Sequence, residues 1–180
     1  MVSCSKSEGP LKVLGFRNYT LGQWRGMLLL GIVVAAFFFG LNYLVLTNVH
    51  FPQEDWFPSV DPRMTPKENA TPAMTFVHGL LYAPLSEELL YRGPLVVGMW
   101  VLHLATARQK ITVRMMTVFV VALAAVTTVW FASVHSLSGV CNVLSAGTFG
   151  IAAAIMTIRF KSLIPGIIAH ALYNAPVTLY

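Results

Sequence analysis

The chain has 180 residues, of which 56% are hydrophobic and 11% are charged, and its formal net charge is +5. Its mean hydropathy is +0.68, whereas a soluble globular domain is about one-quarter charged. The composition therefore excludes an ordinary soluble domain and indicates an integral membrane protein whose surroundings are the lipid bilayer. In such a protein the positive charge reflects membrane topology and does not indicate a nucleic-acid partner.

The N-terminal part is expected to be a polar arm followed by a membrane anchor. Residues 1–25 carry four basic side chains and one acidic side chain, and we interpret them as a cytoplasmic polar arm. Residues 26–49 contain no charged residue and, at ~1.5 Å per residue, can cross a ~30 Å hydrocarbon core. They are predicted to be an uncleaved transmembrane anchor. Its small residues mark either a helix-packing face or apolar filler: Gly31, Ala35, Ala36 and Gly40.

The middle of the chain combines a polar loop with a long apolar stretch. Residues 50–70 contain four prolines and a net charge of −2, which predicts an extracytoplasmic loop. Residues 71–107 are largely apolar, and as one straight helix they would extend about 55 Å, too far for a single span. Pro84 and Pro94 can kink or split this stretch. We therefore expect either a tilted, broken helix or two helices that meet near its centre.

Three further apolar segments follow, at residues 115–134, 140–158 and 164–180. The pattern predicts an all-α polytopic integral membrane helical bundle with about five hydrophobic segments and a broken central helix. If the N-terminus is cytoplasmic and the segments alternate, nine basic residues lie inside and two lie outside. That asymmetry favours a multi-pass protein of the cell membrane with a cytoplasmic N-terminus.

Three charged residues stand at the centre of the long apolar stretch: Glu87, Glu88 and Arg92. A charged side chain in hydrocarbon costs at least ~2.5–3.5 kcal/mol on insertion scales, so such residues usually serve a function. Glu88 and Arg92 are four residues apart, and on a helix they face the same side and can pair. Glu87 lies about 100° further around the helix and stays available for chemistry.

The other strong polar groups of the apolar segments are His135, His170 and Asn174. A carboxylate in a low-dielectric pocket can act as general base on water, and a histidine can hold that water. A second histidine and an amide can donate to a developing oxyanion. Straight helices would leave His135 about 30 Å deep and His170 about 13 Å deep, so broken or re-entrant helices are needed to bring them together.

Three spaced motifs carry a family resemblance: Glu87-Glu88-x-x-x-Arg92, Phe131-x-x-x-His135 and His170-x-x-x-Asn174. Together they resemble the CPBP family of intramembrane proteases, which contains type II CAAX prenyl endopeptidases and proteins linked to bacteriocin processing and immunity. The resemblance implies that residues 71–180 form a catalytic helical core that hydrolyses peptide bonds.

In that resemblance Glu87 is the catalytic base, Glu88 and Arg92 support it, and His135 helps to hold the water. His170 and Asn174 take the place of the oxyanion-stabilising pair. Larger members of the family have about eight spans, so the shorter chain leaves open how the substrate reaches the site and whether the protein forms a homo-oligomer.

Metal dependence also stays open from the residues alone. Glu87, His135 and His170 could form a His₂Glu zinc site, but the sequence lacks the His-Glu-x-x-His spacing that brings two ligands to one helix face. We favour a mechanism without a metal or cofactor, with zinc as the alternative.

The main hypothesis is an intramembrane endopeptidase that cleaves a peptide or a membrane-protein substrate with a glutamate-activated water. One alternative is a non-catalytic membrane immunity or scaffold protein that binds a partner through the same polar cavity. Another is a proton-coupled transporter that uses Glu87 and His135 as a relay, although the sequence shows no inverted repeat.

Overall fold

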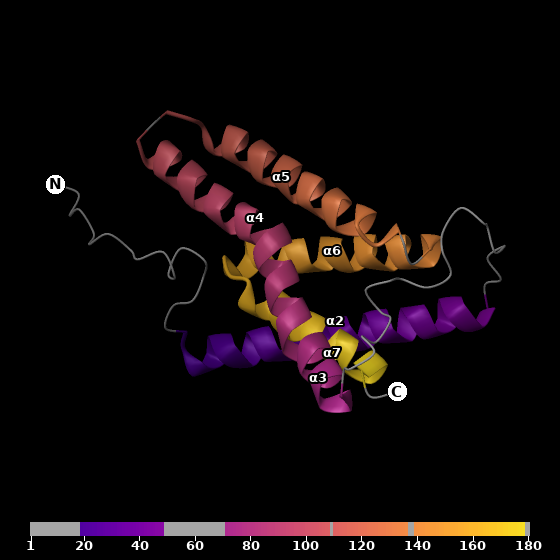
Figure 1. Cartoon of the computed structure of the whole chain (residues 1–180). Coiled ribbons are helices and arrows are strands. Elements are labelled where there is room, and N and C mark those ends of the chain that lie inside the picture. Colours follow the sequence, from indigo (N-terminus) through magenta and orange to yellow (C-terminus); the bar gives the residue numbers. More distant parts are fainter. Residues whose placement is uncertain (1–18, 49–70, 109, 137–138, 179–180) are drawn as a thin grey trace.

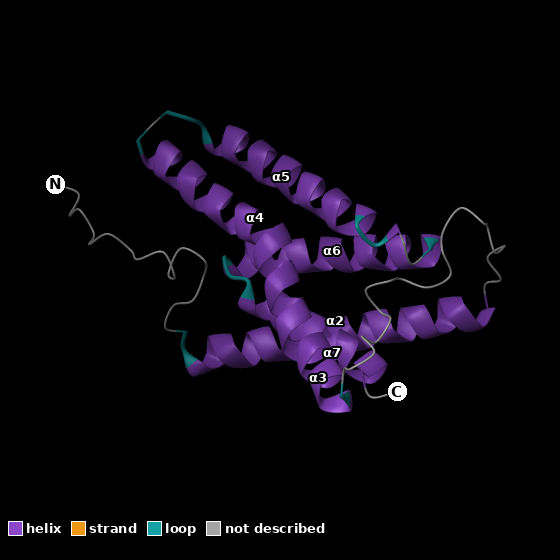
Figure 2. Cartoon of the chain, in the orientation of Figure 1, coloured by secondary structure: helices purple, strands orange, loops and turns teal. Residues whose placement is uncertain are grey.

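A computed structural model describes residues 19–48, 71–108, 110–136 and 139–178. All the regular elements in this part of the chain are helices (Figure 2), as the composition predicts. The expected loop at 50–70 and most of the expected polar arm at 1–25 lie outside the described residues. The helices are α2 Leu21–Asn48, α3 Pro72–Val77, the π-helix η1 His78–Tyr82, α4 Ala83–Ala107, α5 Val113–Ser133, α6 Val140–Phe160 and α7 Ile164–Thr178.

The first helix, α2, begins at Leu21, five residues before the expected start at Gly26. The reason is a capping box at its N-terminus. The Gln23 backbone N–H donates to Thr20 Oγ1 at 3.3 Å, and the Thr20 N–H donates to Gln23 Oε1 at 2.9 Å. These two bonds satisfy donors that a helix otherwise leaves open at its first turn, so polar residues there do not delay the helix.

The long apolar stretch is one helical run from Pro72 to Ala107 with a π-helical turn inside it. The Ala83 N–H donates to the carbonyl of His78, five residues back, and Pro84 follows directly. Pro94 lies inside α4, and the run changes direction between the two halves of that helix (Figure 1). The expected broken central helix is therefore present, with a π-turn before the charged cluster and a proline after it.

Four of the described helices are long and apolar enough to cross a membrane by length and composition. They cover Leu21–Leu41, Ala73–Ala107, Val113–Ser133 and Asn142–Phe160. The fifth hydrophobic segment, α7, has 15 residues, which corresponds to only about 22 Å. Its inward residues Ala169 and His170 are 0% and 5% exposed. The chain is thus a helical membrane bundle in which a short helix lies among the longer ones.

The short helix α7 packs closely against α2. At Gly31 a Cβ atom would lie 2.8 Å from Cγ2 of Ile168, so the glycine permits the close approach. Ala35 and Phe38 continue this buried face of α2, and the Phe38 and Phe149 rings meet edge to face at 5.7 Å. Gly31 and Ala35 thus mark a packing face, whereas Ala36 is exposed and a Cβ atom at Gly40 would meet nothing within 4 Å.

From α4 to α7 the chain reverses direction at each turn, and these turns define two ends of the bundle (Figure 1). The turn from α4 to α5, the turn from α6 to α7 and the beginning of α2 lie at one end, which we call the α4–α5 end. The turn from α5 to α6 and the C-terminal ends of α2 and α7 lie at the other, which we call the α5–α6 end.

Candidate active site

An ion pair lies at the centre of the bundle. Arg92 Nη1 is 3.5 Å from Glu88 Oε1, and both side chains are 0% exposed. The pair follows from the i,i+4 spacing on α4, as expected from the sequence. Removing two charges from solvent costs several kcal/mol per ion, and only mutual attraction and well-placed neighbours offset that cost. The stability of this buried pair therefore depends on the groups that surround it.

Two glycines and one aromatic ring surround this pair. The Arg92 guanidinium lies 4.0 Å from the centroid of the Phe131 ring, a cation–π arrangement. A Cβ atom at Gly150 would lie 3.0 Å from Arg92 Nη2, and one at Gly166 would lie 2.7 Å from Glu88 Oε2. Helices α6 and α7 thus approach the charged groups at positions without a side chain.

His170 joins both glutamates. Its Nδ1 lies 3.3 Å from Glu88 Oε1, and its Nε2 lies 3.7 Å from Glu87 Oε2. An ionised carboxylate can only accept a hydrogen bond, so His170 donates from Nδ1 to Glu88. The Glu87 side chain is 29% exposed, whereas that of Glu88 is 0% exposed. One glutamate is therefore enclosed with Arg92 and the other is accessible.

His135 lies just after the C-terminal end of α5. Its Nδ1 donates to the carbonyl oxygen of Phe131 at 2.7 Å, which assigns the lone pair of the neutral ring to Nε2. The Phe131 ring lies 4.6 Å from the His135 ring and 6.0 Å from the His170 ring. Both histidines thus flank the same phenylalanine despite their different distances from the helix ends.

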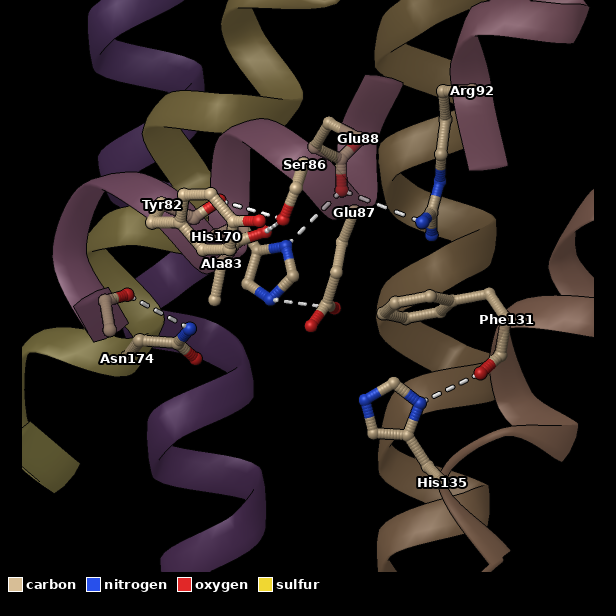
Figure 3. A network of polar contacts seen from close by, with 11 residues as sticks. Tyr82, Ala83, Ser86, Glu87, Glu88, Arg92, Phe131, His135, His170 and Asn174 are labelled. Carbon is tan, nitrogen blue, oxygen red and sulfur yellow. Dashed lines mark hydrogen bonds and ion pairs between the residues drawn. The ribbon is translucent and has the colours of Figure 1, made fainter. Parts of the chain in front are cut away.

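Figure 3 shows how these side chains converge. The Glu87 carboxylate points between the two imidazoles, and the Glu88–Arg92 pair lies above it in this view. The structure therefore brings together five of the six residues expected at the site: Glu87, Glu88, Arg92, His135 and His170.

The sixth residue, Asn174, lies on the same face of α7 one turn beyond His170, and its amide contacts the backbone of η1. Asn174 Nδ2 donates to the carbonyl oxygen of Gly79 at 3.2 Å. In the π-helical pattern that carbonyl would accept from residue 84, but Pro84 has no N–H. The asparagine thus satisfies an acceptor that the proline leaves open. The three sequence motifs do not include Gly79, Pro84 or Gly166. The one signal for these residues in the sequence is the presence of glycine or proline inside an apolar helix.

A structural or catalytic zinc ion needs at least three protein side chains around one point. Within the described residues, no group of three or more His, Cys, Asp or Glu side chains is arranged to hold a metal ion. Glu87 and His170 are neighbours, while the Nδ1–H bond of His135 to Phe131 leaves its Nε2 as the nitrogen that could bind a metal. A mechanism without a metal therefore stays a prediction, with zinc as the alternative, and no chemical step below is written through a metal.

Buried ion pairing, an accessible glutamate and two histidines inside a helical membrane bundle define a candidate intramembrane hydrolase. A family model described as "Type II CAAX prenyl endopeptidase Rce1-like" matches residues 68–176. The match covers more than half of the chain and includes all the residues above, and the chain belongs to this protease family. No curated protein and no solved structure matches the chain.

Proposed function

We propose that the chain is an intramembrane endopeptidase in which Glu87 activates a water molecule to hydrolyse a peptide bond. The single observation that carries this proposal is the contrast between the two glutamates. Glu88 is enclosed with Arg92, while Glu87 is partly exposed beside His170. A general base must reach the water whose proton it takes, and of the two carboxylates Glu87 is the accessible one.

The remaining groups have roles that match their contacts. His135 accepts a hydrogen bond from the water through Nε2, since its Nδ1–H donates to Phe131. Glu88 orients His170 through Nδ1. When both ring nitrogens carry a proton, His170 donates from Nε2 to the oxyanion, and Asn174 adds the second N–H of its amide group.

The reaction balances with these groups alone. The water oxygen adds to the scissile carbonyl carbon while its proton passes to the Glu87 carboxylate, and the carbonyl oxygen becomes an oxyanion. The oxyanion then collapses, the C–N bond breaks, and Glu87 returns the proton to the leaving nitrogen. The products are a carboxylic acid and an amine, and the carboxylate is regenerated.

The charges support a multi-pass topology with a cytoplasmic N-terminus. Outside the site, every charged side chain of the described residues is basic and lies at the α4–α5 end: Arg25, Arg108, Lys110, Arg114, Arg159 and Lys161. Basic residues concentrate on the cytoplasmic side of membrane proteins. Reporter fusions after residue 110 and after residue 180 test this topology, because they should report cytoplasmic and extracytoplasmic locations respectively.

The catalytic test compares the purified wild type with Glu87→Gln and Glu87→Ala. Two probes are used, a farnesylated peptide ending in a CAAX sequence and an unmodified peptide library read by mass spectrometry. We expect cleavage of at least one probe by the wild type and loss by about 10²–10⁴-fold in both variants, the size of a general-base contribution. Leu90→Ala, at an exposed position of the same helix, is the matched control and should cleave normally.

A chelator arm addresses the metal question in the same assay. The proposal expects unchanged cleavage after chelation and no metal bound in proportion to the protein. Cleavage that survives Glu87→Ala contradicts the glutamate mechanism. A cellular phenotype that survives Glu87→Gln while no peptide is cleaved would instead favour the immunity or scaffold function.

A further inference from the structure

Exposure changes systematically along the bundle on either side of the Glu87–His170 contact. Toward the α4–α5 end, the next residues are enclosed: Arg92, Leu95 and Leu163 are 0% exposed, and Met156 is 2% exposed. The polar side chains of Thr157 and Ser162 at this end are also 0% exposed. An aqueous path to Glu87 from this end would have to cross a layer of enclosed side chains, and protein interiors are packed with few voids large enough for water.

Toward the α5–α6 end the lining is polar and partly exposed. His135 lies at the turn between α5 and α6, and Asn142 Nδ2 donates to its carbonyl oxygen at 3.5 Å. One turn further along α6, Ser145 Oγ lies 3.2 Å from the Tyr173 hydroxyl of α7. These side chains are all partly buried, so polar groups continue from the site to the surface at this end.

We infer that the site opens at the α5–α6 end, on the side of the membrane opposite the basic turns, and that it receives an extracytoplasmic substrate. The α4–α5 end carries the exposed basic residues Arg108, Lys110, Arg114, Arg159 and Lys161, and such residues mark the cytoplasmic face. The substrate class is therefore a translocated peptide or an outward-facing segment of a membrane protein, rather than a prenylated C-terminus made in the cytosol.

The claim that the site receives a substrate rests on the proposed function. The side from which the site is accessible can be tested without catalysis. The background variant is Cys4→Ser/Cys141→Ser, which removes both native cysteines. Single cysteines are then introduced at Ser145, Thr157 and Lys110. Ser145 and Thr157 are small polar residues on the same helix, one partly buried at the open end and the other 0% exposed, and Lys110 reports the basic end.

A charged, membrane-impermeant maleimide is applied to right-side-out and inside-out bacterial membrane vesicles. Because thiol labelling follows exposure, we expect Ser145→Cys to react at least about tenfold faster than Thr157→Cys in right-side-out vesicles. Lys110→Cys should react only in inside-out vesicles. Labelling of Ser145→Cys from the same side as Lys110→Cys, or from neither side, overturns the inference. Failure of the Glu87 experiment would leave these labelling results intact, so the two proposals fail separately.

Discussion

The side-chain amide of Asn174 lies 3.2 Å from the carbonyl oxygen of Gly79 and joins the last turns of α7 to the π-helical turn before the glutamates. We expect Asn174→Ala to lower stability, because the Gly79 carbonyl is partly buried and a buried acceptor left without a donor costs about 1–3 kcal/mol. For a chain of this length that corresponds to a fall of about 2–4 °C in melting temperature for each kcal/mol. Thermal unfolding in detergent measures the change.

Pro84→Ala provides the matched background for this measurement. It restores an N–H at position 84, which can donate to the Gly79 carbonyl in the π-helical pattern. The stability loss from Asn174→Ala should therefore shrink in the Pro84→Ala protein, and a double-mutant cycle should show coupling. Additive losses would mean that the amide does not act through this carbonyl. Cleavage rates in the same four proteins separate this contact from an oxyanion role, which Pro84→Ala cannot restore.

The two neighbouring glutamates should differ sharply in their effect on stability. Glu88→Ala leaves the Arg92 guanidinium buried without its partner, and breaking a buried pair in this way costs about 3–5 kcal/mol. Glu87→Ala removes a partly exposed carboxylate and should change the melting temperature little. The double variant Glu88→Leu/Arg92→Met should recover much of the stability without activity, since it removes both charges together. Equal losses for the two single variants would contradict the assigned geometry.

Much of the fold follows from the sequence for simple physical reasons. A run of apolar residues must form a helix in lipid because each backbone polar group needs a partner there, so the helices appear near their expected places. The break before the charged cluster was also predictable from Pro84. The earlier start of α2 was missed, although the spacing of Thr20 and Gln23 is that of a capping box, whose reciprocal bonds replace the solvent as partners.

The sequence predicted that these polar residues lie close together, but it predicted only some of the contacts between them. The i,i+4 spacing was enough to predict the Glu88–Arg92 pair, because both residues lie on one helix. The contacts of His170 with both glutamates depend on how α7 crosses α4, and such crossings are fixed by packing of distant residues such as Gly31 and Ile168. The link from Asn174 to Gly79 depends in turn on a π-helical register, which residue spacing alone does not specify.

Phe131 should be the most sensitive aromatic residue of the core, because its ring contacts the Arg92 guanidinium and both histidines. Phe131→Leu keeps the position apolar but removes a desolvated cation–π contact of about 2 kcal/mol. We expect a lower melting temperature together with slower cleavage, since His135 and His170 lose a shared neighbour. Phe119→Leu on the outer surface of α5, where the side chain is 52% exposed, should change neither quantity.

Gly166 tests how tightly α7 must approach the buried ion pair. A Cβ atom there would lie 2.7 Å from Glu88 Oε2, so Gly166→Ala must displace the carboxylate or the helix, and overpacking of this kind typically costs about 1–3 kcal/mol. Because Glu88 also holds His170, cleavage should fall even at temperatures where the protein stays folded. Gly93→Ala is the matched control, since a Cβ atom at that helical position meets nothing within 4 Å. Alanine there should raise the melting temperature slightly through its better helix propensity; a similar rise for Gly166→Ala would show that α7 does not need the glycine to approach Glu88.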